Sequence, residues 1–298
     1  MEMSKVGFIG LGIMGKPMAK NLIKAGFSLV VFDIAEASLK ELAADGAEKA
    51  ASPKEVAEKA AEVIITMLPN SPHVREAVCG KNGIAEGIRN GQIVVDMSSI
   101  APLVSRELCA VLKEKGADML DAPVSGGQEK AEKGTLAIMV GGAQSAYENV
   151  KPILEKMGGS VYVGESGAGQ ITKLVNQTIV AINIAAIAEG MSLAEKAGVD
   201  PRRVFEAIRK GLAGSQCLED KAPRMFEGRY NPGFRINLHI KDLGNVLDTG
   251  HSLHNAMPLA SSVMEMMQSL ANSGHETLDH GALGMYYEKL NGISLKKS

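Results

Sequence analysis

The stretch VGFIGLGIMGKPMAKNL (residues 6–22) joins an apolar run to an amphipathic run through three glycines. This order predicts a strand that turns directly into a helix. In such a turn Gly10 permits the sharp bend, Gly12 lets another molecule approach the backbone, and Gly15 lets the helix lie close to the strand. The first amides of the helix then attract phosphate groups. The spacing therefore predicts a strand–turn–helix unit that holds a pyrophosphate.

Short β-branched runs alternate with helical stretches from residue 5 to about residue 163. Several of the helical stretches end at a glycine, as a C-terminal cap would. Near-continuous apolar strands that alternate with helices indicate a mostly parallel sheet covered on both faces. We therefore predict an α/β Rossmann-type doubly wound domain over residues 1–163. The expected strands are KVGFIG, SLVVFD, EVIITML, QIVVDM, ADMLDAP, LAIMVGG and VYVGE.

The alternation stops after residue 163, and the remaining pattern is helical. We predict an all-α C-terminal domain over residues 164–298. The Ala-rich run 178–194 and the stretch SSVMEMMQSL offer more apolar surface than this domain can bury alone. A homo-oligomer, dimer or tetramer, is therefore expected to form through this domain. The expected helices cover residues 168–197, 200–212, 215–228, 235–254, 258–273 and 279–290.

Composition excludes several classes of function. The formal net charge of −2 offers no electrostatic attraction to nucleic acid or to an anionic membrane. Cys79, Cys109 and Cys217 are isolated, so we expect neither a disulfide framework nor a metal site. The run 178–194 is too short and too polar for a membrane span, and the first residues do not resemble a signal peptide. We expect a cytoplasmic protein whose partner is a small molecule.

Asp33 ends the second predicted strand, SLVVFD. A carboxylate at that place can accept hydrogen bonds from both hydroxyls of an adenosine ribose, and it repels a 2′-phosphate. The sequence therefore favours NAD(H) and disfavours NADP(H). The alternative is a glycine turn in an α/β fold that binds no nucleotide, with Asp33 as a loop cap.

Two further loops follow later strands, at the edge where doubly wound folds bind ligands. In TMLPNSPHV, Leu68 and Pro69 could line the binding site of the adenine or ribose. In DMSSIAP, Ser98 or Ser99 could bond the nicotinamide or its ribose. Turn chemistry, with a serine as helix cap, explains either serine equally well.

The loop DAPVSGG offers one hydroxyl and two unobstructed backbone amides, from Ser125, Gly126 and Gly127. Such a row suits a carboxylate. A nucleophilic serine would need a histidine base and a third group, and no histidine in the sequence has a context that argues for such a triad.

The stretch GQITKLVNQ places Lys173, Asn176 and Gln177 on one face of the helix expected over 168–197. A nicotinamide enzyme that acts on a carbonyl needs a proton donor, and Lys173 can supply the proton beside two amides. Periodicity alone favours a plainer interpretation, in which the lysine extends from the helix end into solvent, because surface lysines are common.

Read as a set, the ordered motifs of the chain resemble the β-hydroxyacid dehydrogenase family from about residue 5 to residue 290. The motifs are GFIGLGIMGKPMAKNL, MLPNSPHV, DMSSIAP, DAPVSGG, GAGQITKLVNQ and HIKDL. The resemblance implies an NAD-dependent oxidoreductase in which Lys173 is the general acid/base. It implies that the substrate is bound by Ser125, Gly126, Gly127, Asn176 and Gln177. It implies that the cofactor is bound by Gly10, Gly12, Ile13, Met14, Gly15, Asp33, Leu68, Pro69, Ser98, Ser99 and Lys241.

One position departs from a common family pattern. Many members carry Asn four residues after the catalytic lysine, whereas this chain has Gln177 there and Asn176 one residue earlier. The resemblance therefore does not say which of the two amides contacts the substrate.

The choice of substrate rests on resemblance within the family. The segments MLPNSPHV, DMSSIAP, GLAGSQCL, FRINLHIKDL and YYEKL resemble most the members that reduce tartronate semialdehyde (2-hydroxy-3-oxopropionate) to D-glycerate. The alternative is 3-hydroxyisobutyrate or another β-hydroxyacid or short semialdehyde. A noncatalytic dinucleotide-sensing module is a third hypothesis, which loss of Lys173 or of the Ser125 loop would have signalled.

Overall fold

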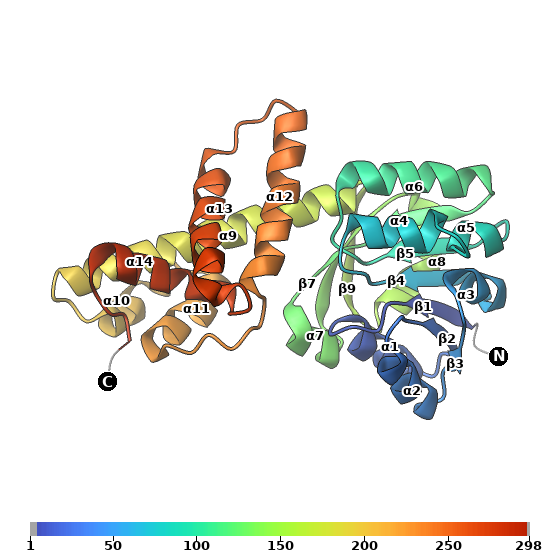
Figure 1. Ribbon diagram of the computed structural model, residues 1–298, viewed down its shortest axis with the longest axis horizontal. Helices are drawn as coiled ribbons and strands as arrows, with labels where there is room; N and C mark the ends of the chain where they lie inside the picture. Colours follow the sequence, from blue (N-terminus) through green and yellow to red (C-terminus); the bar gives the residue numbers. More distant parts are fainter. Residues whose placement is uncertain (1–4, 297–298) are drawn as a thin grey trace. The chain divides into compact units, whose positions relative to one another are not determined.

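The computed structural model describes residues 5–296. The chain divides into two compact units, the first ending at Lys173 and the second beginning at Leu174 (Figure 1). The domain boundary expected at residue 163, and the roles expected for the two domains, stay predictions.

The first unit is built on one sheet with the order β3-β2-β1-β4-β5-β6-β8-β7, in which β9 also pairs with β8. The pairs from β3 through β6 are parallel, β8 runs antiparallel to β6 and β7, and β9 runs parallel to β8. This confirms the predicted Rossmann-type, mostly parallel sheet. The strands are β1 Val6–Ile9, β2 Leu29–Phe32, β3 Glu48–Lys49, β4 Val63–Thr66, β5 Ile93–Asp96, β6 Asp118–Asp121, β7 Val124–Ser125, β8 Leu136–Gly141 and β9 Gly158–Gly164.

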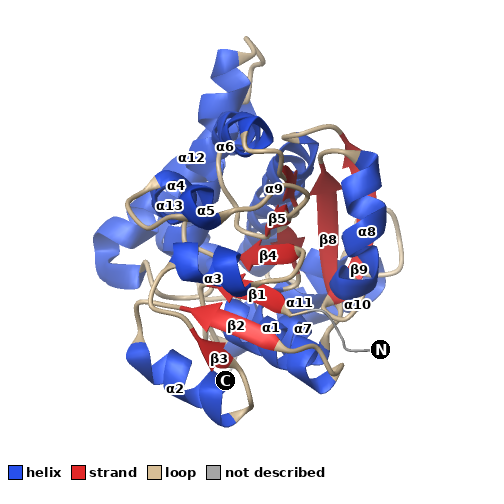
Figure 2. Ribbon diagram, turned by 90° about the vertical axis from the view of Figure 1, so that its right-hand side faces the viewer, coloured by secondary structure: helices blue, strands red, loops and turns tan. Residues whose placement is uncertain are grey.

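Helices cover both faces of this sheet (Figure 2). Successive residues of a strand point to opposite faces, so Phe8 lies in one apolar core and Ile9 in the other. Helices α1, α2, α7 and α8 line the first core, and α3 to α6 line the second. Burial on both faces explains why the strands read as continuous apolar runs. The helices are α1 Gly15–Lys24, α2 Glu36–Ala44, α3 Pro53–Lys59, α4 Ser71–Cys79, α5 Ile84–Gly87, α6 Pro102–Glu114, α7 Gly127–Lys133 and α8 Gln144–Leu154.

The second unit is helical, and its core gathers Ala, Ile, Leu, Met and Phe side chains from α9 through α14. Helix α9 begins in the first unit and contributes Ile184 and Met191 to this core. By length and hydropathy alone α9 resembles a membrane span, which is weak evidence because a core helix passes the same test. The helices are α9 Ala168–Lys196, α10 Pro201–Ile208, α11 Gln216–Glu227, α12 Ile236–Ser252, α13 Pro258–Leu270 and α14 Leu283–Asn291, with short turns at Ala271–His275 and His280–Ala282.

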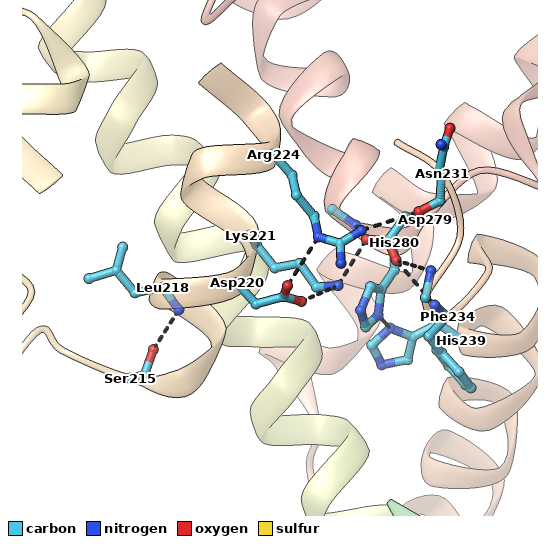
Figure 3. A network of polar contacts seen from close by, with 12 residues as sticks. Ser215, Leu218, Asp220, Lys221, Arg224, Asn231, Phe234, His239, Asp279 and His280 are labelled. Carbon is cyan, nitrogen blue, oxygen red and sulfur yellow. Dashed lines mark hydrogen bonds and ion pairs between the residues drawn. The ribbon is translucent and has the colours of Figure 1, made fainter. Parts of the chain in front are cut away.

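A buried aspartate, Asp279, ties the loop before α12 to α11 (Figure 3). Its Oδ1 accepts hydrogen bonds from Lys221 Nζ and Gly281 N, both at 2.9 Å. Its Oδ2 accepts from Gly233 N at 2.9 Å and Phe234 N at 3.1 Å. Both oxygens therefore have protein partners, which is what a buried carboxylate requires.

Candidate active site

The three glycines of the turn between β1 and α1 differ in whether the protein leaves room for a side chain. Gly10 has φ of +96°, and a Cβ there would lie 2.3 Å from the carbonyl oxygen of Met67. A Cβ on Gly15 would lie 1.9 Å from the carbonyl oxygen of Gly10. A Cβ on Gly12 would meet nothing within 4 Å. The protein's own backbone thus excludes side chains at Gly10 and Gly15, whereas the space at Gly12 is open to a ligand.

Asp33 follows β2 and lies beside this turn. Its Oδ2 accepts a hydrogen bond from Leu11 N at 2.5 Å, and its Oδ1 accepts from Ala35 N at 2.7 Å. Two backbone amides therefore fix the carboxylate, and each oxygen keeps further lone pairs that can accept a hydroxyl group. Ile13 in the turn is 58 % exposed, and Met14 is the N-cap of α1.

Ser98 joins the loops that follow β4 and β5. Its hydroxyl accepts a hydrogen bond from Leu68 N at 2.8 Å, and the residue is fully buried. Ser99 is half-buried. The hydroxyl of Ser98 is thus engaged inside the protein, and of the two serines Ser99 is the more accessible to a ligand.

A fully buried carboxyl group, Asp96, lies at the end of β5. Its Oδ1 accepts hydrogen bonds from Thr66 Oγ1 at 2.8 Å and from Ser98 N at 3.2 Å. Its Oδ2 has no hydrogen-bond partner among residues 5–296. Burial raises the pKa of Asp96 to about 6, and the Thr66 and Ser98 hydrogen bonds offset only part of that effect.

A second buried carboxylate, Asp121, holds the start of α9. Its Oδ1 accepts from Gly167 N at 2.7 Å and its Oδ2 from Gln170 N at 2.8 Å. Gly167 directly precedes α9 and Gln170 lies in its first turn, and the positive end of a helix favours a carboxylate. Burial nevertheless raises the pKa of Asp121. The side chain of Gln170 adds two bonds to the loop after β5, because Nε2 donates to Ser98 O at 2.7 Å and Oε1 accepts from Ile100 N at 3.1 Å.

Lys173 lies one helical turn beyond this anchor, and it is buried, with only 5 % of its surface exposed. A lysine that extends from a helix end into water would be exposed, so the plainer interpretation does not describe this side chain. Sequence reasoning missed Asp96, Asp121 and Gln170. The available signal was that Asp33, Asp96 and Asp121 all stand where a strand ends.

The loop expected to hold a carboxylate follows β6 on the same sheet. Ser125 belongs to β7, and Gly126 and Gly127 have φ of +139° and +68°. These positive φ values suit glycine, which has no Cβ to clash with the backbone. Ser125 and Gly127 are half-buried, and Gly126 is exposed.

In the second unit, Asn176 and Gln177 are linked to α12. Asn176 Nδ2 donates to Gln177 Oε1 at 2.8 Å, and Gln177 Nε2 donates to Asp242 Oδ2 at 2.7 Å. The ammonium of Lys241 lies 2.9 Å from Asp242 Oδ1. Gln177 is 4 % exposed, whereas Asn176 is half-buried. Within the described part of the chain, no group of three or more His, Cys, Asp or Glu side chains could hold a metal ion.

The raised pKa of Asp96 predicts a pH-dependent stability. The carboxyl group is neutral in the folded and the unfolded chain well below pH 4, so burial then costs no charge. As the pH rises towards 6 the unfolded chain ionises first, and this contribution to stability is lost. Asp96→Asn removes the titration. We therefore compare the free energies of unfolding of the two proteins at each pH. The variant should gain about 2–3 kcal/mol relative to the wild type between pH 4 and pH 7.

Urea denaturation of both proteins across this pH range measures the difference. A difference that stays constant with pH would show that Asp96 titrates at its ordinary value in the folded protein.

Two family models cover most of the chain. One, described as the NAD binding domain of 6-phosphogluconate dehydrogenase, matches residues 5–164. The other, described as NAD-binding of NADP-dependent 3-hydroxyisobutyrate dehydrogenase, matches residues 167–287.

Known proteins match over nearly the full length. The chain is 44 % identical to 2-hydroxy-3-oxopropionate reductase of Escherichia coli K12, over 94 % of this chain and 95 % of that protein. It is 37 % identical to 2-(hydroxymethyl)glutarate dehydrogenase of Eubacterium barkeri, over 99 % of each. A solved structure of Mycobacterium tuberculosis 3-hydroxyisobutyrate dehydrogenase with L-serine superposes with a TM-score of 0.87 and 34 % identity, over 95 % of this chain and 98 % of that one.

Proposed function

Because the chain belongs to the β-hydroxyacid dehydrogenase family of nicotinamide-dependent oxidoreductases, we propose that it reduces tartronate semialdehyde to D-glycerate with NADH. The choice of substrate is supported by the near full-length sequence identity to the Escherichia coli enzyme. This identity exceeds that to the Eubacterium barkeri dehydrogenase and to the solved 3-hydroxyisobutyrate dehydrogenase. The resemblance of the helical segments supports the same choice.

The residues around the glycine turn fit a dinucleotide. The open space at Gly12 admits a pyrophosphate against the backbone, next to the first amides of α1. Asp33 is fixed by two amides where a ribose would lie, and Leu68, Pro69, Ser99 and Lys241 complete the proposed cofactor contacts. When bound, the reduced nicotinamide supplies a hydride to the aldehyde carbon of the substrate.

The chain's own residues hold the substrate and supply the proton. Ser125 Oγ and the amides of Gly126 and Gly127 bind the carboxylate. Lys173 Nζ gives a proton to the aldehyde oxygen as the adjacent carbon gains the hydride, so the aldehyde becomes the primary alcohol of glycerate. In the reverse direction Lys173 accepts that proton. The burial of Lys173 supports this role, because a surface lysine has no defined position for proton transfer.

Between the two amides, we assign the substrate contact to Asn176. Both ends of the Gln177 amide are engaged by protein groups, whereas Asn176 is half-buried. Gln177 then positions its neighbour.

Replacing Lys173 tests the proton donor. We expect Lys173→Met to lower kcat by about 10²–10⁴-fold and to leave the Kd for NADH within about twofold, because the loss falls on proton transfer. Lys196→Met is the matched control on the same helix, since Lys196 is exposed and donates to Asn291 O in the second unit. Steady-state rates and NADH titration measure both effects. Near-normal turnover in Lys173→Met would overturn the assignment.

Asp33 supports NADH as the cofactor, although one matching family model is described as NADP-dependent. Ile34 is 94 % exposed, so an arginine can replace it without disturbing a core. We expect Asp33→Ser with Ile34→Arg to raise kcat/KM for NADPH relative to NADH by about tenfold or more, because repulsion of the 2′-phosphate is replaced by attraction. Ile34→Arg alone is the control. A wild-type enzyme that already prefers NADPH would refute the cofactor choice.

A substrate panel tests the second candidate, which the solved 3-hydroxyisobutyrate dehydrogenase favours. We expect kcat/KM for tartronate semialdehyde to exceed that for methylmalonate semialdehyde, the precursor of 3-hydroxyisobutyrate. The two aldehydes differ only at C2, which carries a hydroxyl in the first and a methyl in the second. A tenfold advantage for the methyl compound, about 1.4 kcal/mol in transition-state binding, would reverse the choice.

Exposed apolar side chains on α9 support a homo-oligomer. Val175, Ile179 and Leu193 are 53 %, 54 % and 71 % exposed. Covering such side chains removes apolar area from water, which favours association of like subunits. A cytoplasmic location stays a prediction.

A further inference from the structure

We propose that Asp242, acting through Gln177, fixes the orientation of the Asn176 amide so that Asn176 Oδ1 accepts a hydrogen bond from the C2 hydroxyl of the substrate. This chain of three residues, Asp242, Gln177 and Asn176, is called the amide relay below. The inference deepens the proposed function and rests on it for the identity of the hydroxyl group.

Asp242 is 2 % exposed and has a different partner on each oxygen. Oδ2 accepts from Gln177 Nε2 at 2.7 Å, and Oδ1 faces the Lys241 ammonium at 2.9 Å. The adjacent ammonium of Lys241 compensates the buried negative charge of the carboxylate. An ionised carboxylate only accepts hydrogen bonds. Asp242 therefore requires a donor from Gln177.

That requirement sets the direction of every later bond in the relay. Gln177 must turn Nε2 towards Asp242, which leaves Oε1 to face Asn176. Oε1 is an acceptor, so the Asn176 group that faces it is the donor Nδ2, at 2.8 Å. The carbonyl oxygen of Asn176 lies on the other branch of its amide and remains to accept a bond. A hydroxyl group can supply that bond, whereas a methyl group cannot.

Helix α12 also holds the backbone of Gln177. His239 stands three residues before Asp242 on α12, and its Nε2 lies 3.2 Å from Gln177 O. His239 is fully buried against the ring of Phe234, with ring centroids 5.6 Å apart. Because backbone and side chain are both held, Gln177 cannot reverse its amide without a change at Asp242.

The donor-to-acceptor direction of the hydrogen bonds from Asn176 to Asp242 is called the polarity of the relay. The substitution Asp242→Asn removes this polarity at nearly constant side-chain volume. An amide at position 242 can donate as well as accept, so Gln177 and Asn176 are no longer forced into one orientation. We expect the ratio of kcat/KM for tartronate semialdehyde to that for methylmalonate semialdehyde to fall by about tenfold or more, because a site that bonds a hydroxyl discriminates against an analogue without it.

The double substitution Asp242→Asn with Gln177→Glu restores the polarity. The carboxylate introduced at position 177 accepts from the amide introduced at position 242 on one side and from Asn176 Nδ2 on the other, and the total charge equals that of the wild type. We expect the substrate ratio and the Tm to recover from the values of Asp242→Asn. Both variants remove the Asp242 carboxylate that faces Lys241, so this loss is common to the two.

Asp279→Asn is the matched control, because Asp279 is an equally buried aspartate paired with a lysine in the same unit (Figure 3). It should lower the Tm and leave the substrate ratio unchanged. A ratio unchanged in Asp242→Asn, or one that the double variant fails to recover, overturns the relay. If the wild type does not turn over tartronate semialdehyde while the Tm of the double variant recovers, the proposed substrate is wrong and the relay polarity stands.

Discussion

The carboxylate of Asp121 holds the first turn of α9, and the placement of the candidate catalytic lysine depends on that bond pair. A helix start leaves backbone amides without intrahelical partners, and two of them donate to Asp121. Hydrogen bonds to a charged group contribute about 1.5–3 kcal/mol each, so the pair offsets a large part of the cost of burying the carboxylate. Gln170 adds a second attachment to the loop after β5. Lys173 follows within one turn of rigid helix.

Burial of two carboxyl groups at neighbouring strand ends is a cost that an ordinary sheet would avoid. Asp96 and Asp121 are paired positions on the neighbouring parallel strands β5 and β6. Burial raises the pKa of both, and the negative charge of Asp121 makes Asp96 harder still to ionise. What the protein gains is a set of directed acceptors that join β4, β5, β6 and α9 at one edge. Proteins commonly accept such local losses of stability where a site must be held still.

Much of the fold could be predicted because its signals are local. Strand and helix periods repeat within a few residues, and α9 was expected over 168–197 and is found over Ala168–Lys196. The family and the sheet type are confirmed. The hydrogen bonds of the buried aspartates could not be predicted, because they join residues far apart in the sequence. Asp121 bonds Gln170 across 49 positions, and Asp242 bonds Gln177 across 65. The motif HIKDL drew attention to Lys241, while the neighbouring Asp242 carries the bond to Gln177.

The three glycines of the turn are subject to different selective pressures. Gly10 and Gly15 are enclosed by the protein's own backbone, so any descendant that keeps the fold must keep them. Gly12 faces open space, and only a bound molecule gives a reason to exclude a side chain there. A lineage that abandoned the dinucleotide would therefore be free to change Gly12 first. The state of that single position then distinguishes retained binding from retained architecture.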